Sequence, residues 1–331
     1  MAARLDAPVL GAQSDITAFS RWQVSTSWRH QRSDRHFRGS EEEANRQAEG
    51  SEVINTINLM ELGIRYNPNP QWSVSLGIPY FAAERSSPIR DPNRVVVDRS
   101  VVEANALGDI TLTARRLLWN PREHPESNIS LGLGVKFPTG DYDVFDTRER
   151  LVDGQRVFTD ESVDQSIQPG DGGWGAILDV STYQRIRSSG GTLYASGTYL
   201  INPEGTNGVP TFRGAIGEEI MSIADQYLAR AGVTWSGASW KGFGMSLGGR
   251  IEGVPVEDLI GDSDGFRRPG YALSVEPGLS YTRGAHAFSL AVPVAVHRNR
   301  QRSVPDRLVP GRIGDAAFAD YVVMLGYWRK L

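Results

Sequence analysis

The feature that most constrains this fold is a series of short segments in which apolar residues alternate with small or polar ones. Strict alternation is typical of a β-strand with two unlike faces. In NISLGLGVKF, 128–137, every odd position is apolar, and the even positions are small or polar. About twelve such segments follow one another, at 22–28, 54–66, 72–81, 108–119, 128–137, 174–186, 192–201, 220–235, 242–251, 271–281, 286–296 and 320–328. The sequence therefore predicts an all-β protein.

The connections between these segments alternate between long and short. Long polar stretches such as 30–52 and 139–173 are each followed by a short turn, such as 67–71 or 187–191. Outer-membrane barrels place long loops outside and short turns on the periplasmic side, whereas a soluble β-sandwich or jelly roll has no reason to do so. The pattern favours a transmembrane antiparallel up-and-down β-barrel of about 12 strands, with short periplasmic turns and long extracellular loops.

Composition agrees with a barrel and excludes other classes. Mean hydropathy is -0.34 and no run of 18 apolar residues exists, which excludes a transmembrane helix and is also what a barrel with polar loops gives. A net charge of -4 argues against binding to nucleic acid. The start of the chain has no secretory apolar region, so the protein is either cytoplasmic or a mature form whose signal peptide is absent from this chain. We expect the mature form, in the outer membrane of a Gram-negative bacterium.

Aromatic residues mark the expected ends of the strands. Trp and Tyr are typical of the interface between lipid and water. Those beside the chain ends and short turns are Trp22, Tyr66, Trp72, Trp119, Trp235, Trp240, Tyr281, Tyr327 and Trp328. The expected organisation is a barrel over 19–331, preceded by a periplasmic or lumen-plugging segment at 1–18.

The charged positions on the other face of each segment are the expected lumen lining. If the apolar set faces lipid, the opposite set lines the interior. These residues are Arg21, Arg29, Glu61, Arg65, Asp109, Arg115, Lys136, Asp179, Arg185, Arg230, Arg250, Glu252, Glu276 and His297. Their modest basic excess predicts a weak preference for anions in an open pore. Arginine and carboxylate side chains on opposite walls could also form ion pairs across the interior and leave only a narrow path.

Prolines recur near the outer ends of strands. Proline removes a hydrogen bond from the ladder, so in a closed barrel it marks a bulge, a bend or a gap. Pro79, Pro138 and Pro293 are the candidates for a lateral gap. Such a gap predicts that a hydrophobic solute leaves sideways into the bilayer.

Four stretches carry a resemblance to a known family. GDITLTARRLLW, LGLGVKFPTGDYD, QPGDGGWGAILDVSTYQRI and GTLYASGTYLIN resemble the outer-membrane transporter family of the MetA pathway of phenol degradation, and the likeness spans about residues 55–331. The resemblance implies a monomeric barrel channel for small, often aromatic or otherwise hydrophobic compounds. Its motifs are architectural, so it implies no binding residues.

We therefore expect a channel for passive uptake of such compounds, with the lipid bilayer and a small solute as partners and no cofactor. One alternative is a closed structural or partner-binding barrel. Another is a barrel lipid hydrolase, for which no catalytic residue is found, because Ser289 follows His286 by three residues and so faces the other way in a strand. No metal is expected, although acidic clusters at 41–43 and 262–264 would suit Ca²⁺; we interpret them as solvated loop charge.

Overall fold

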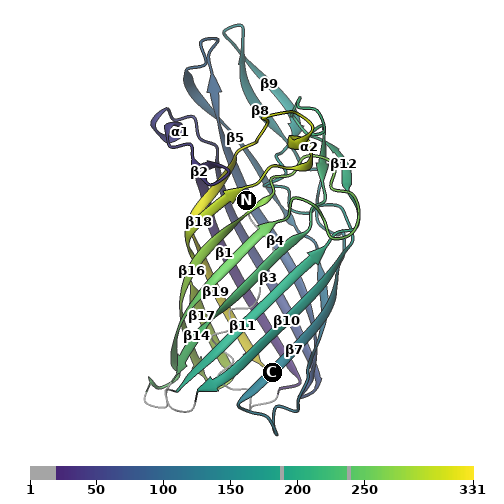
Figure 1. Ribbon diagram of the computed structural model, residues 1–331, viewed down its shortest axis with the longest axis vertical. Coiled ribbons are helices and arrows are strands. Elements are labelled where there is room, and N and C mark those ends of the chain that lie inside the picture. Colours follow the sequence, from purple (N-terminus) through teal and green to yellow (C-terminus); the bar gives the residue numbers. More distant parts are fainter. Residues whose placement is uncertain (1–19, 187–189, 237–239) are drawn as a thin grey trace.

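The computed structural model describes residues 20–186, 190–236 and 240–331, which form a closed antiparallel β-barrel (Figure 1). The predicted segment at 1–18 lies outside these residues. Ten of the twelve barrel strands are continuous: β1 (Trp22–Arg38), β3 (Ile54–Asn69), β4 (Trp72–Arg90), β7 (Ser127–Lys136), β10 (Gly175–Ile186), β11 (Gly191–Ile201), β14 (Gln226–Ser236), β15 (Phe243–Val254), β16 (Gly270–Arg283) and β19 (Ala316–Lys330). The other two are split, into β5 (Val96–Leu107) with β6 (Thr111–Leu117) and β17 (His286–Ala291) with β18 (Val294–Arg300).

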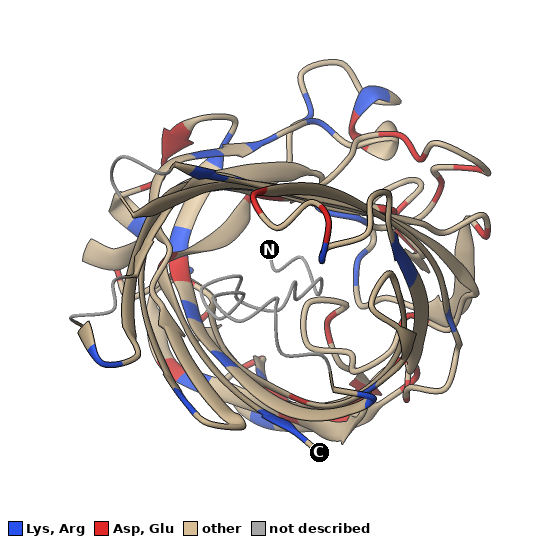
Figure 2. Cartoon of the chain, turned by 90° about the horizontal axis from the view of Figure 1, so that it is seen from below, with Lys and Arg blue, Asp and Glu red and all other residues tan. Residues whose placement is uncertain are grey.

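The barrel closes because its last strand pairs with its first. β19 is antiparallel to β1 from Gln23 to Phe37, and the view along the barrel shows an unbroken ring (Figure 2). Closure leaves no free strand edge inside a membrane, where unpaired backbone groups are costly. The predicted 12-stranded up-and-down barrel is therefore confirmed.

β7 shows which face of the wall is apolar. Leu131, Leu133 and Val135 are 49%, 69% and 39% exposed on the outside, whereas Gly132 and Lys136 on the other face are buried. A continuous apolar outer surface is unstable in water and suits lipid tails. The alternating stripe is therefore the outer, lipid-facing side of the barrel.

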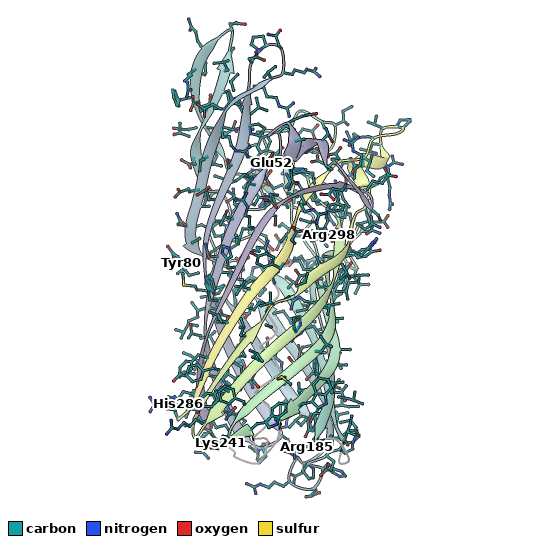
Figure 3. All side chains as sticks on the ribbon, turned by 90° about the vertical axis from the view of Figure 1, so that its left-hand side faces the viewer. Glu52, Tyr80, Arg185, Lys241, His286 and Arg298 are labelled. Atoms are coloured by element: carbon teal, nitrogen blue, oxygen red, sulfur yellow. The ribbon has the colours of Figure 1, made fainter. Side chains whose placement is uncertain are left out.

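The two ends of the barrel differ as the loop lengths predict. Short turns lie at the lower end, where Arg185, Lys241 and His286 are found, and long extensions rise at the other end (Figures 1 and 3). Aromatic pairs lie near the short turns, such as Trp22 with Tyr66, whose ring centroids are 4.6 Å apart. The long loops carry β2 (Glu41–Glu42), α1 (Asn45–Ala48), β8 (Phe145–Val152), β9 (Gln155–Ser162), β12 (Thr206–Pro210), β13 (Ile220–Ser222) and α2 (Val304–Arg307). In the described ranges, no helix is long and apolar enough to cross a bilayer.

The longest loop, 139–173, packs against the inner wall. Its Val163 and Ile167 are 2% and 0% exposed and join an apolar cluster with Phe81 of β4 and Val102 of β5. Hydrophobic burial of these side chains stabilises the inward position of the loop. The outer half of the barrel is therefore narrowed from within.

Candidate functional site

The interior of the barrel contains a buried network of charges on β1 and β14–β16. Arg29 Nη2 donates to Glu252 Oε1 at 2.8 Å, and Arg250 Nε donates to Glu252 Oε2 at 2.8 Å. Glu276 accepts from Arg230, and it pairs with Arg250 at 3.4 Å. Each of these side chains is at most 12% exposed. At this level opposite charges fill the interior, so the arrangement restricts the passage of a wide solute.

A second charged group lies on β3, β6 and β10. Arg115 Nε donates to Asp179 Oδ1 at 2.8 Å, and Arg65 donates to the hydroxyl of Ser75 at 3.0 Å. Gly132 of β7 lies between Arg115 and Asp179, and a Cβ there would be 2.9 Å from Arg115 Cγ. The glycine therefore makes room for this ion pair on the wall.

The remaining predicted lumen residues are dispersed. Lys136 pairs with Asp171 and lies 3.9 Å from Asp109 at the outer end of β7. Glu61 is half-buried, and its carboxylate would lie 3.2 Å from a Cβ at Gly77. Arg21 precedes β1 and is exposed, and Arg185 lies at the short-turn end (Figure 3). The structure therefore gathers some of the predicted charges into pairs and leaves these two at the lower rim.

His297 was expected in the lumen, and its position corrects that prediction. It pairs with Leu273, whose side chain is 37% exposed on the outer face, and its ring lies 5.8 Å from that of Tyr271. A β-bulge shifts the register between Leu273 and Ser274. A bulge adds one residue to a strand, so it reverses the alternation beyond it and turns His297 outward.

Pro79 and Pro138 flank the break at 108–110 between β5 and β6, where Gly108 N still donates to Pro79 O at 2.9 Å. Phe137 N donates to Ile110 O at 2.8 Å, and beyond Pro138 a further backbone bond joins Asp141 N to Leu107 O at 3.3 Å. Opposite Pro79, β5 and β6 are separated by a break at 108–110. Within the described residues, β5 forms a ladder only with β4, and its other neighbour is β8, through bonds from Glu103 N to Asp146 at 2.8 Å and from Glu149 N to Ser100 Oγ at 3.0 Å.

Pro293 does not mark a gap. Val292 N donates to Pro277 O and Val322 N donates to Pro293 O, both at 3.0 Å. The strand is bent between β17 and β18, but backbone bonds continue on both sides. This prediction is wrong, because neighbouring carbonyl and amide groups compensate for the missing donor of proline.

Gly108, Gly140 and Gly170 allow three backbone segments to pass close to one another beside the break at 108–110. A Cβ at Gly140 would be 2.7 Å from the backbone of Gly108, and a Cβ at Gly170 would be 2.7 Å from Gly140 O. Asp109 joins the segments, since Oδ1 accepts from Gly140 N at 3.0 Å and Oδ2 from Asp171 N at 3.1 Å. Both ends of the longest loop are thereby fixed beside the break.

A cavity of about 330 Å³ lies inside the outer end of the barrel. Its lining includes seven arginines but only two aspartates. We call four of these arginines, Arg85, Arg148, Arg213 and Arg268, together with Phe212, the arginine vestibule. Sequence reasoning missed these residues, and the Arg267–Arg268 pair in a long loop was the one visible signal.

Among the residues that the structure describes, one group of potential metal ligands is present, formed by His36, Glu43 and Asp315. His36 Nε2 accepts from Val53 N at 2.8 Å, so Nδ1 carries the proton and donates to Asp315 at 2.6 Å. Arg46 pairs with both acids. Although burial alone would raise it, the bond from His36 and the charge of Arg46 hold the pKa of Asp315 below its usual range. Because Arg46 and the proton on His36 Nδ1 already occupy the carboxylate oxygens, the group is an ion-pair cluster rather than a metal site.

His286 of β17 has an aromatic partner and lies away from Ser289. His286 Nδ1 lies 2.9 Å from the hydroxyl of Tyr327, while Ser289 is buried on the inner face. These side chains are on opposite faces, as the sequence spacing predicts. The arrangement supports no serine–histidine catalysis by this pair.

Comparison with known proteins supports the fold. No family model and no curated protein matches this sequence. The chain is similar to the COG4313 outer membrane channel from Pseudomonas putida F1, with a TM-score of 0.61 at 11% identity over 96% of this chain and 98% of that one. It is also similar to the translocator domain of the autotransporter NalP from Neisseria meningitidis, with a TM-score of 0.47 at 9% identity (95% and 90% covered). For the toluene transporter TodX of P. putida the TM-score is 0.47 at 10% identity (96% and 91%). The first likeness shows that this chain has the barrel fold of an outer-membrane channel, and the MetA pathway is not confirmed.

Proposed function

We propose that this protein is an outer-membrane channel of a Gram-negative bacterium that admits small hydrophobic or aromatic compounds by passive diffusion. It reaches that membrane through a signal peptide that is removed on export. The fold it shares with the COG4313 outer membrane channel supports the location. The resemblance to the MetA pathway family favours phenolic compounds among the solutes.

The observation that carries this proposal is the break in regular strand pairing at 108–110, which Pro79 and Pro138 flank, beside an apolar inner cluster. Phe81 follows Pro79 by two residues and lies on the same face of β4, packed in the cluster with Val102 and Ile167. A solute that has entered through the outer cavity meets apolar side chains next to a wall segment where regular strand pairing is interrupted and separate bonds, such as Gly108 N to Pro79 O, join the strands. The path we propose leads sideways into the bilayer, because the charges between β1 and β14–β16 obstruct the way down the axis for an apolar molecule.

Entry of N-phenyl-1-naphthylamine, a neutral aromatic dye that fluoresces in lipid, tests this function. Cells producing the protein should show a faster fluorescence rise than cells carrying an empty vector. Cells producing an equal amount of a variant with Pro79→Val and Pro138→Val serve as the matched control for the path. Equal rates with and without the protein would overturn the proposal.

The ion pairs across the interior favour a second candidate, a closed structural or partner-binding barrel. A scaffold needs no open path through its lumen, so buried ion pairs can occupy its interior. Planar bilayer recordings and dye entry together separate the candidates. Silence in both assays favours the scaffold, whereas dye entry without conductance favours the lateral path.

A further inference from the structure

Two guanidinium groups in the arginine vestibule share one carboxylate. Arg268 donates to both oxygens of Asp164 at 2.7 Å, and Ser166 also donates to Oδ1. Arg85 reaches Asp164 only at 3.4 Å, and its other bonds in the described chain go to neutral acceptors, Asn55 at 2.9 Å and Ser166 at 3.4 Å. One carboxylate thus offsets two cations, and a positive charge remains beside Arg85.

Two further arginines crowd the same space. Arg213 pairs with Glu218 at 2.8 Å, and Arg148 pairs at 3.0 Å with Glu161, which also pairs with Arg150. Burial first and then the charge of Arg268 lower the pKa of Arg213, whereas Glu218 and Asp164 act in the opposite direction. The side chains of Arg85, Arg148, Arg213 and Arg268 are 12–25% exposed. They are therefore open to a molecule in the cavity.

Aromatic rings hold these guanidinium groups in place. Arg213 and Arg268 lie 4.2 and 4.5 Å from the ring centroid of Phe266, and Arg148 lies 4.6 Å from that of Phe212. Such cation–π contacts orient a guanidinium without neutralising it. Phe212 and Met221 line the cavity, so apolar surface adjoins the cations.

We propose that the arginine vestibule binds monoanions that join an aromatic ring to a carboxylate, with the carboxylate at Arg85 and the ring against Phe212 and Met221. This inference rests on the proposed function, because it names a class among the aromatic solutes of the channel. Arg85 reaches its nearest carboxylate only at 3.4 Å, so its guanidinium is left to bind the single charge of one further carboxylate. Arginine is suited to it, since its planar fork donates two parallel bonds to a carboxylate.

Binding of radiolabelled benzoate to the purified full chain in detergent tests the proposal, with benzamide as the neutral analogue of the same shape. Benzoate should bind more tightly than benzamide. Arg85→Gln should weaken benzoate binding about tenfold, since a charge-assisted bond is lost, and Arg85→Lys should restore part of it. Benzamide binding should not change.

Arg307→Gln is the matched control, because it removes the same charge from the exposed helix α2, where Arg307 pairs with Glu257 away from the cavity. It should leave benzoate binding as in the wild type. The unheated mobility of each variant in SDS gels reports whether the barrel is folded. If a folded Arg85→Gln variant binds benzoate as the wild type does, the proposal fails.

Two results separate this proposal from the proposed function. If inorganic phosphate displaces benzoate at equal concentration, the assignment to aromatic carboxylates is overturned, while the entry of neutral dye is unaffected. If dye entry does not depend on the protein but benzoate binds through Arg85, the channel function fails and the binding site stands.

Discussion

Arg29 of β1 and Glu252 of β15 form an ion pair of 2.8 Å across the barrel interior, although the sheet places β19, the split strand β17–β18 and β16 between them. Both side chains point inward from a closed wall, so the ion pair crosses the lumen from β1 to β15 and forms a chord of the barrel's cross-section. Glu252 also accepts from Arg250 and thereby connects this chord to Glu276 and Arg230. The two sides of the barrel are held together at this level.

Removing the cross-lumen pair should widen the axial path. We expect Arg29→Ala to raise single-channel conductance in planar bilayers, because it removes a large side chain and the chord that it forms. Adding Glu252→Ala should change conductance less than the sum of the single changes, since the two residues act as one pair. Arg116→Ala is the control, as Arg116 lies on the outer face over Trp72. Conductance equal to that of the wild type would show that the pair does not limit the path.

Glu276→Gln should strongly destabilise the barrel. The carboxylate is 3% exposed and lies between Arg230 and Arg250, and Arg230 Nε and Nη1 are buried with no hydrogen-bond partner in the described part of the chain. Removing one member of a buried ion pair costs about 3–5 kcal/mol, because the remaining charge stays buried. Urea unfolding followed by tryptophan fluorescence measures the loss. Glu257→Gln, at an exposed pair with Arg307, should cost less than about 1 kcal/mol; equal losses in the two variants would contradict the argument.

The membrane-crossing parts of the strands could be predicted because lipid on one side and a polar interior on the other impose alternation. Beyond the membrane this constraint ends. The upper part of β4, at 82–90, and all of β5 were expected as loop, since polar and apolar residues are mixed there, with water outside and the folded loop 139–173 inside. These extensions make up the outer half of the barrel.

The charged face could also be predicted from alternation, but its pairing could not. The contact between Arg29 and Glu252 depends on curvature, and the outward turn of His297 depends on a bulge that leaves no mark in the sequence. The arginine vestibule joins Arg85, Arg148, Arg213 and Arg268, which lie on four separate segments of the chain. Only the folded loops bring these side chains together.

Restoring the ladder at Pro79 and Pro138 should slow entry of a neutral aromatic dye. Valine at both positions supplies the missing backbone donors and favours continued β-structure. The opening in the barrel wall beside β5 should therefore become narrower. Dye entry in producing cells measures the effect. Pro293→Val is the control, because the ladder already continues through Val292 and Pro293, and it should leave the rate unchanged. An unchanged rate in the double variant would exclude a lateral path at this place.

Asp164→Asn should destabilise the outer loops in a pH-dependent way. Burial alone would raise the pKa of Asp164, but the charges of Arg268 and Arg85 hold it well below its usual range. A group with a lowered pKa in the folded state stabilises the protein above its unfolded pKa, about 4 for aspartate, and loses that contribution as the pH falls through the folded value. The variant should therefore lose about 3 kcal/mol at pH 7.

The difference between wild type and Asp164→Asn in the free energy of unfolding should stay constant from pH 7 to about pH 4 and shrink only below it. Urea unfolding at a series of pH values measures this. Asp98→Asn is the control, because Asp98 lies on the exposed face of β5 and pairs with the exposed Arg156, so its effect should be small at every pH. A difference that does not shrink below about pH 4, or that grows as the pH falls from 7, would place the Asp164 pKa in its ordinary range or above it. It would also show that Arg85 and Arg268 do not share this carboxylate in solution.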